Sequence, residues 1–249
     1  MKAWLVATAF LTRVPVPIDA NAADVGRAAR WFPLVGAVMG GAAALAAQGL
    51  GQLTSMPSTL GALLLVGLGA WATGAIHLDG LADTADGFGG GRSRADVLRI
   101  MEDPVIGSCG AIVLLLVMTM KIGALATLLE RHAAAPFLVA APTLSRWTIV
   151  ALSAWLPYAR PEGGLGQAVT VQRDAAGIVS ATAVTAVVTM ITLRTNGLIL
   201  WALTVLVMVA LGRAARRRAG GVTGDVFGAS VELTETAVLV GAVLLTGRA

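Results

Sequence analysis

The sequence predicts an all-α integral membrane protein with six or seven transmembrane helices joined by polar loops. Of its 249 residues, 57% are hydrophobic and only 13% are charged, whereas soluble domains carry roughly 25% charged residues. The mean hydropathy is +0.81, and the apolar residues form runs near the roughly 20 residues that a membrane crossing needs. No linker or low-complexity stretch divides the chain. Residues 1–249 are therefore expected to form a single polytopic domain.

The expected elements follow the apolar runs in chain order. Residues 1–13 predict a helix lying at the membrane interface, because their apolar run is too short for a signal peptide. Pro15 and Pro17 end that helix and force an extended segment, and residues 19–30 predict a short amphipathic helix. Glu232 and Glu235 make the last span the least regular. Spans are expected at about 32–50, 60–76, 105–129, 134–157, 176–193, 197–212 and 231–247.

The basic residues predict that the N-terminus is cytoplasmic, because cytoplasmic loops carry an excess of Lys and Arg. In that orientation the opposite side holds only Arg131, Arg194 and Arg248. All acidic residues except Glu130 also fall on the cytoplasmic side, so the active site is expected at that face. The basic residues on that side are Lys2, Arg13, Arg27, Arg30, Arg92, Arg94, Arg99, Arg160, Arg173, Arg213, Arg216, Arg217 and Arg218.

Composition also narrows the partners. The net charge is +4, but the basic residues lie in loops between apolar runs and no base-reading motif is present, so nucleic-acid binding is not expected. The one cysteine, Cys109, makes neither an internal disulfide nor a zinc site by itself. The lipid bilayer is the partner that the composition predicts.

The most informative stretch is H-L-D-G-L-A-D-T-A-D-G-F-G-G-G, residues 77–91. On a helix that turns about 100° per residue, Asp79, Asp83 and Asp86 share one narrow face. Three carboxylates so close repel one another unless a cation lies among them. Mg²⁺ prefers oxygen ligands and often shares carboxylates with substrate phosphates. These aspartates therefore predict a Mg²⁺ site where a membrane helix meets water, although a solvated helix end is the alternative.

Other polar residues near the aspartates are candidates with two interpretations each. His77 is either a polar helix cap or a general base or phosphate contact. Gly89–Gly91 with Arg92 is either a linker or a phosphate-binding loop. Arg146 lies inside a span and needs a partner, either a carboxylate or a substrate phosphate. The glycine-rich loop 220–232 places Thr223, Asp225 and Glu232 across the same membrane face.

Six stretches resemble the cobalamin synthase family, whose members are adenosylcobinamide-GDP ribazoletransferases. They span nearly the whole chain in order, and no departure removes a candidate ligand. They are F-L-T-R-V-P-V-P at 10–17, R-W-F-P-L-V-G at 30–36, H-L-D-G-L-A-D-T-A-D-G at 77–87, R-I-M-E-D-P-V-I-G-S-C-G at 99–110, L-S-R-W at 144–147 and G-G-V-T-G-D-V-F-G-A at 220–229.

The resemblance implies a Mg²⁺-dependent enzyme of the bacterial inner membrane. It would join adenosylcobinamide-GDP to α-ribazole or its 5′-phosphate and release GMP. Asp79, Asp83 and Asp86 would hold Mg²⁺, and His77, Asp86 and Asp103 are the catalytic candidates. Substrate would be bound by Arg13, Arg92, Arg146, Thr223, Asp225 and Glu232. The oligomeric state stays open, a homo-oligomer included.

Two other functions fit parts of the pattern. A CDP-alcohol phosphatidyltransferase also has spaced aspartates at a membrane face, but Thr84-Ala85-Asp86 follows Asp83 where that family continues with an Ala-Arg pair. A small transporter would use Arg146 and the aspartates for ion coupling and would need acids at mid-membrane. Release of GMP rather than CMP, and nucleotide-dependent turnover in detergent, would separate these alternatives from the ribazoletransferase.

Overall fold

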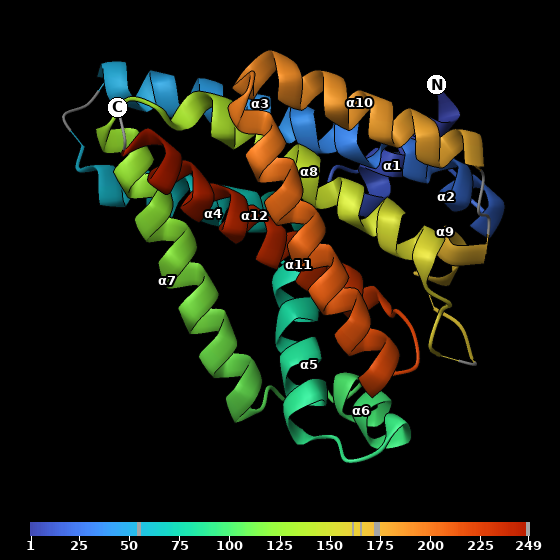
Figure 1. Cartoon of the computed structure of the whole chain (residues 1–249). Helices are drawn as coiled ribbons and strands as arrows, with labels where there is room; N and C mark the ends of the chain where they lie inside the picture. The colour runs from blue at the N-terminus through green and yellow to red at the C-terminus, as the bar shows by residue number, and fades with distance from the viewer. Residues whose placement is uncertain (54–55, 161, 165, 172–174, 248–249) are drawn as a thin grey trace.

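The computed structural model describes residues 1–53, 56–160, 162–164, 166–171 and 175–247; Arg173 and Arg248, counted above for orientation, lie outside them. Within these ranges the secondary structure is helical apart from one isolated parallel bridge between Tyr158 and Val222 (Figure 1). The elements are α1 Lys2–Leu11, α2 Ala22–Ala28, η1 Ala29–Trp31, α3 Phe32–Leu53, α4 Ser58–Thr73, α5 Ile76–Gly90, α6 Arg94–Met101, α7 Ser108–Glu130, α8 Ala134–Trp155, α9 Gln167–Val171, α10 Ala175–Leu193, α11 Asn196–Arg218 and α12 Gly224–Thr246.

The predicted helix class and number of spans are confirmed. In the described chain, six helices are long and apolar enough to cross a membrane, and α4 with α5 forms a bent pair that adds a seventh only if the two helices together make one span. The expected loop 220–232 is wrong, because α12 already begins at Gly224. Thr223 caps this helix by accepting a hydrogen bond from the Val226 backbone N–H at 3.3 Å. Asp225 and Glu232 therefore lie on a helix.

The chain bends sharply between α4 and α5. The expected span 60–76 ends early, at Thr73, and the two helix axes meet at 89°. Gly74 and Ala75 both have left-handed backbone, with φ of 66° and 59°. Glycine adopts this conformation freely, whereas alanine does so at a cost. The acidic helix α5 is therefore a separate helix and does not continue the apolar helix α4.

Two glycines bring α3 and α8 into backbone contact. Gly36 and Gly40 lie one turn apart on α3, and a Cβ atom on them would collide with the backbone carbonyls of Pro142 and Leu138. Pro142 has no N–H, so the Leu138 carbonyl lacks its ordinary helical partner and is left facing α3. Small residues at fixed spacing allow this close approach of membrane helices.

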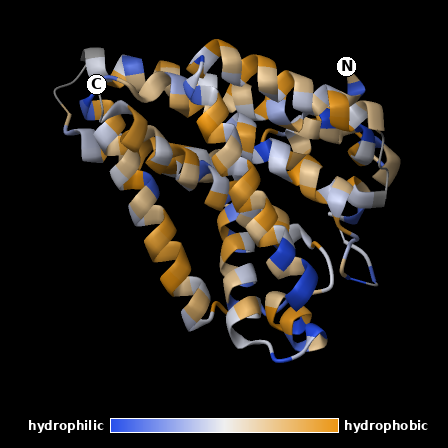
Figure 2. Cartoon of the chain, in the orientation of Figure 1, coloured by the Kyte–Doolittle hydropathy of each residue, from blue (hydrophilic) through white to orange (hydrophobic). Residues whose placement is uncertain are grey.

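The ends of the helices sort into two groups (Figure 1). The C-terminus, the end of α3 and the turn between α7 and α8 lie at the upper left. The N-terminus, α6 and α9 lie at the right and the bottom. Hydrophilic residues gather on α6 and on the end of α11 in Figure 2. The long polar segments therefore share one end of the helix bundle, which is called the polar end below.

Candidate active site

Acidic residues of α5 and α12 come close to one another where these two helices cross. Asp79, Asp83 and Asp86 all lie on α5, as predicted, and Asp225 in the first turn of α12 joins them. The crossing is close because a Cβ atom on Gly80 would lie 2.8 Å from the Asp225 carbonyl oxygen. The opposing glycine of α12, Gly228, would meet the Gly80 Cα at 3.2 Å. Glycine–glycine contact thus brings the acids of two distant segments together.

The negative charge on this face is poorly compensated. Asp83 lies on α5, outside the six spans. Partial burial, together with the charges of Asp79, Asp225 and Asp86, raises the pKa of its carboxyl to about 7, and Arg160 offsets this only in part. Neither Asp79 nor Asp83 makes a side-chain hydrogen bond or ion pair to another described residue. Such a face favours a cation that could relieve the repulsion.

Asp86 differs from the other two aspartates of α5 because it anchors the start of α7. Its carboxylate accepts hydrogen bonds from the backbone N–H groups of Gly107 at 2.7 Å and Gly110 at 2.8 Å. The first N–H groups of a helix have no partner within the helix and carry its positive dipole end. Asp86 therefore has a structural role, and a catalytic or metal-binding role for it stays a prediction.

Arg160 joins the acidic face from a segment that sequence analysis counted only for orientation. Its Nη2 lies 2.7 Å from Asp225 Oδ2, and its Nε lies 3.3 Å from Glu102 Oε1. Thr223 donates a hydrogen bond to the same Asp225 oxygen at 3.1 Å. Arg160 thus links the end of α6 to the start of α12 beside the aspartates. The sequence carried no signal for this contact beyond the charge itself.

Three further candidate residues lie around the site without an ion pair to its aspartates, among the residues that the structure describes. Asp103 is exposed and accepts a hydrogen bond from the Val105 backbone N–H at 3.0 Å. Arg92 is exposed in the turn between α5 and α6. Arg13 lies against Gly74 at the bend before α5. Their roles in catalysis or binding stay predictions.

Glu232 and Arg146 belong to a second, buried cluster inside the bundle. Lys121 Nζ of α7 lies 2.5 Å from Glu232 Oε2 and 2.9 Å from Glu235 Oε2. Arg146 of α8 pairs with Glu235 and with Ser145. Two cations thus balance two anions, and removing one partner of such a pair costs about 3–5 kcal/mol. Of the two interpretations of Arg146, the structure shows the carboxylate partner.

His77 faces this second cluster and not the aspartates. It is 4% exposed, and it lines the same cavity as Arg146, Glu235 and Lys121. It lies two residues before Asp79, which on a helix is a rotation of about 200°. The opposite faces of α5 thus carry the histidine and the acids. The expectation that His77 acts together with these aspartates rested only on its nearness to them in the sequence.

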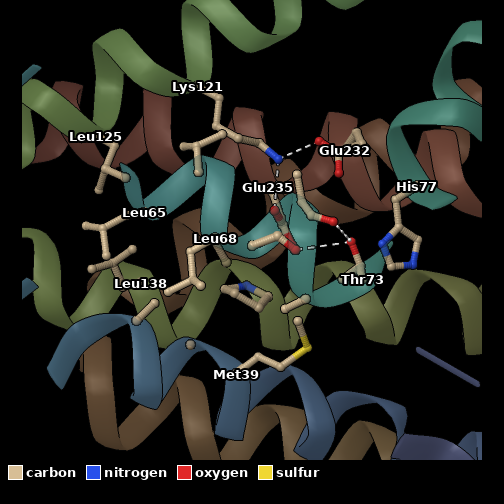
Figure 3. Close-up of a pocket in the computed structure, with 18 of the residues that line it drawn as sticks. Met39, Leu65, Leu68, Thr73, His77, Lys121, Leu125, Leu138, Glu232 and Glu235 are labelled. Carbon is tan, nitrogen blue, oxygen red and sulfur yellow. Dashed lines mark hydrogen bonds and ion pairs between the residues drawn. The ribbon is translucent and has the colours of Figure 1, made fainter. Parts of the chain in front are cut away.

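A cavity of about 330 Å³ lies beside the second cluster. Figure 3 shows apolar side chains of several helices around it, with Lys121, Glu232, Glu235 and His77 on one side. The transporter alternative required acids at mid-membrane, and Glu232 and Glu235 do lie inside α12, but both are ion-paired. The labelled lining residues are Met39, Leu65, Leu68, Leu125, Leu138, Thr73, His77, Lys121, Glu232 and Glu235.

The acidic face fits a Mg²⁺ ion that is bound by one or two carboxylates together with a substrate phosphate. In the part of the chain that the structure describes, no three His, Cys, Asp or Glu side chains are placed to hold a metal by themselves. Mg²⁺ commonly takes one or two carboxylates and completes its shell with substrate phosphates and water. Asp79 is exposed and Asp83 half-buried, and both have free oxygens. This donor set fits Mg²⁺ that arrives with a phosphate-bearing substrate.

Residues 3–243 match the model of the cobalamin-5-phosphate synthase family. The chain belongs to this family. Adenosylcobinamide-GDP ribazoletransferases from Thiobacillus denitrificans and Pseudomonas aeruginosa are 38% and 40% identical to it, over 96% of this chain and 94% and 97% of their own. The enzyme of that name from Stutzerimonas stutzeri is 38% identical over 100% of both chains. No solved structure matches the chain.

Membership of the cobalamin-5-phosphate synthase family confirms the resemblance read from the six sequence stretches. It shows that the chain is an enzyme, a transferase of cobalamin biosynthesis. The motifs at 77–87 and 220–229, far apart in the sequence, form the two sides of the α5–α12 crossing. The phosphatidyltransferase and transporter alternatives are set aside by this assignment.

Proposed function

We propose that this family member is an adenosylcobinamide-GDP ribazoletransferase whose reaction takes place at the acidic face of α5. It joins adenosylcobinamide-GDP to α-ribazole or its 5′-phosphate and releases GMP, which yields adenosylcobalamin or its 5′-phosphate. The observation that carries the proposal is the close crossing of α5 and α12, which brings Asp225 to the aspartates of α5. The names of the full-length relatives support the substrates.

The reaction displaces GMP when a ribazole hydroxyl attacks the phosphorus on the cobinamide side. Phosphoryl transfer depends chiefly on positioning and on charge stabilisation. Asp79 and Asp83 would hold Mg²⁺ with the diphosphate, and the ion would neutralise the charge that builds up on the phosphate oxygens. Thr223 and Arg160 orient the Asp225 carboxylate beside them. Because His77 faces away, a carboxylate of this face is the proposed acceptor of the hydroxyl proton.

We place this site at the cytoplasmic face of a bacterial inner membrane. The two groups of helix ends seen in Figure 1 match the two sides predicted from the basic residues. The group rich in arginine is the cytoplasmic one by the charge bias of membrane proteins. The partners are then the two substrates and the lipid bilayer.

The test is turnover by the purified full chain in detergent. Adenosylcobinamide-GDP and α-ribazole with Mg²⁺ should yield GMP and adenosylcobalamin, and chelation of divalent ions should stop both. Absence of GMP release with both substrates and Mg²⁺ present would overturn the proposal.

The Asp83→Asn variant tests the site itself. It removes one carboxylate of the acidic face and should lower the rate about 100-fold or more, as expected for loss of a group that stabilises transition-state charge. Asp96→Asn is the matched control. Asp96 lies in the first turn of α6, where its carboxylate accepts a hydrogen bond from the Ser93 hydroxyl, and it is not part of the acidic face. Full activity in Asp83→Asn would refute the assignment of the site.

A further inference from the structure

We infer that Arg160, which Asp225 and Glu102 hold beside the acidic face, is a residue of this site that binds the substrate's diphosphate. The inference rests on the proposed function, since it names a substrate contact in that same site. Arg160 lies in the segment after α8, outside every stretch that resembled the family.

The backbone around Arg160 is fixed in place. The Ala159 N–H donates to the Val222 carbonyl at 2.8 Å, and the Val222 N–H donates to the Pro157 carbonyl at 2.9 Å. This is the parallel bridge between Tyr158 and Val222. A Cβ atom on Gly221 would collide with the Pro157 carbonyl, so the two segments are in direct backbone contact. The side chain of Arg160 therefore starts from a rigid position beside the first turn of α12.

The charges of the site require a cation of this kind. Asp79, Asp83 and Asp225 would repel a diphosphate, and in the described chain Arg160 is the basic residue that forms an ion pair with this group of acids. Arg146 is already paired with Glu235. A guanidinium presents a planar fork of N–H groups that matches two phosphate oxygens, which makes it well suited to this contact.

The contacts that hold Arg160 can be exchanged. The Nε is buried but makes no hydrogen bond, although Glu102 lies near it. The Glu102 side chain is 53% exposed, and ion pairs of exposed groups are weak. Asp225, the closer partner at 2.7 Å, also lies beside the aspartates proposed to hold the cation. When its carboxylate turns to a cation, the guanidinium is left free to bind phosphate.

The experiment measures GDP binding to the full chain in detergent with Mg²⁺, by calorimetry and without turnover. Arg160→Gln should weaken GDP binding at least 10-fold, and Arg160→Lys should fall between Gln and the natural residue. Arg217→Gln, which changes an exposed arginine of α11, should bind GDP like the unmodified chain. In turnover, Arg160→Gln should raise KM for adenosylcobinamide-GDP and leave KM for α-ribazole unchanged.

A purely structural role for Arg160 gives different results. The double variant Arg160→Gln/Asp225→Asn removes both charges of the ion pair. If Arg160→Gln alone lowers the midpoint of thermal unfolding, the double variant should restore it. The double variant should nevertheless bind GDP more weakly than Asp225→Asn alone. If the double variant binds GDP as tightly as Asp225→Asn does, the inference is overturned. If the chain binds GDP through Arg160 yet makes no cobalamin, the proposed function fails and this inference stands.

Discussion

At the scale of single residues, three acidic residues differ in the contacts that their carboxylates make. Asp83 is crowded by other carboxylates, which with burial raises the pKa of its carboxyl to about 7. Asp86, one turn later, is saturated by the N–H groups of Gly107 and Gly110. Glu232 is neutralised by Lys121 inside the bundle. Of these three, only Asp83 has both free oxygens and a reason to attract a cation.

This difference predicts a pH dependence of stability. The pKa of Asp83 is about 7 in the folded chain, against an ordinary 3.8, so the folded state binds the proton more tightly. Its contribution to stability is present at low pH and is lost as pH rises through about 7. Without divalent ions, the thermal unfolding midpoint of Asp83→Asn should exceed that of the unmodified chain by more at pH 8 than at pH 5.

The control is again Asp96→Asn. Hydrogen bonds from Ser93 hold the pKa of the Asp96 carboxyl below its ordinary value, so both folded and unfolded forms are ionised between pH 5 and pH 8. Its effect on the midpoint should therefore not change over that range. Equal shifts for Asp83→Asn at both pH values would contradict the crowding of charge described here.

The sequence predicted the residues of the acidic face better than their contacts. Helical spacing alone was enough to place Asp79, Asp83 and Asp86 together. The partners of Asp86 come 21 and 24 residues later, and Arg160 lies 65 residues from Asp225. Lys121 falls within the expected span 105–129, but its partners lie on another helix, more than 100 residues away in the chain. Local periodicity carries no information on such contacts.

At the scale of elements, backbone contacts at glycine fix how the helices cross. The contact of α3 with α8 depends on the missing Cβ of Gly40, which would collide with the Leu138 carbonyl. Composition predicted close packing of small residues in general. Which glycines are in contact could not be predicted, because Gly40 and Gly41 are neighbours and only one of them faces α8.

This contact predicts opposite effects for neighbouring substitutions. Gly40→Ala should destabilise the chain by about 1–3 kcal/mol, the usual cost of overpacking. Gly41→Ala meets nothing within 4 Å and should be neutral or stabilising, because alanine favours helix. Thermal unfolding in detergent measures both. A Gly40→Ala variant as stable as Gly41→Ala would show that α3 and α8 are farther apart than described.

The bend between α4 and α5 could not be predicted from the sequence. The apolar run and the acidic helix were expected to be continuous, and Gly74 alone did not indicate otherwise. Ala75 also takes the left-handed conformation, which propensity would not have suggested. In the structure the Ala75 N–H donates to the Ala70 carbonyl at 2.8 Å, and the Arg13 side chain packs against Gly74 at the same bend.

At the scale of the whole molecule, the number of crossings decides where the termini lie. Six spans and the α4–α5 pair, if it crosses, make seven. An odd number places the C-terminus on the periplasmic side when the N-terminus is cytoplasmic. Alkaline phosphatase fused to the C-terminus should therefore be active, and the same enzyme fused after Ala219 should be inactive. If the alkaline phosphatase fusion at the C-terminus is inactive and a separate C-terminal GFP fusion is fluorescent, α4 and α5 return to the side from which they entered the membrane.

The crossing of Gly80 and Gly228 lies between two polar regions, one formed by side chains of α7, α8 and α12 and the other by acids of α5 and α12. Above it lie the buried ion pairs of Lys121 and Arg146; below it lies the acidic face. An energised membrane drives protons along any unbroken file of titratable groups. We therefore expect the backbone contact of these two glycines to block proton movement between the buried ion pairs and the acidic face.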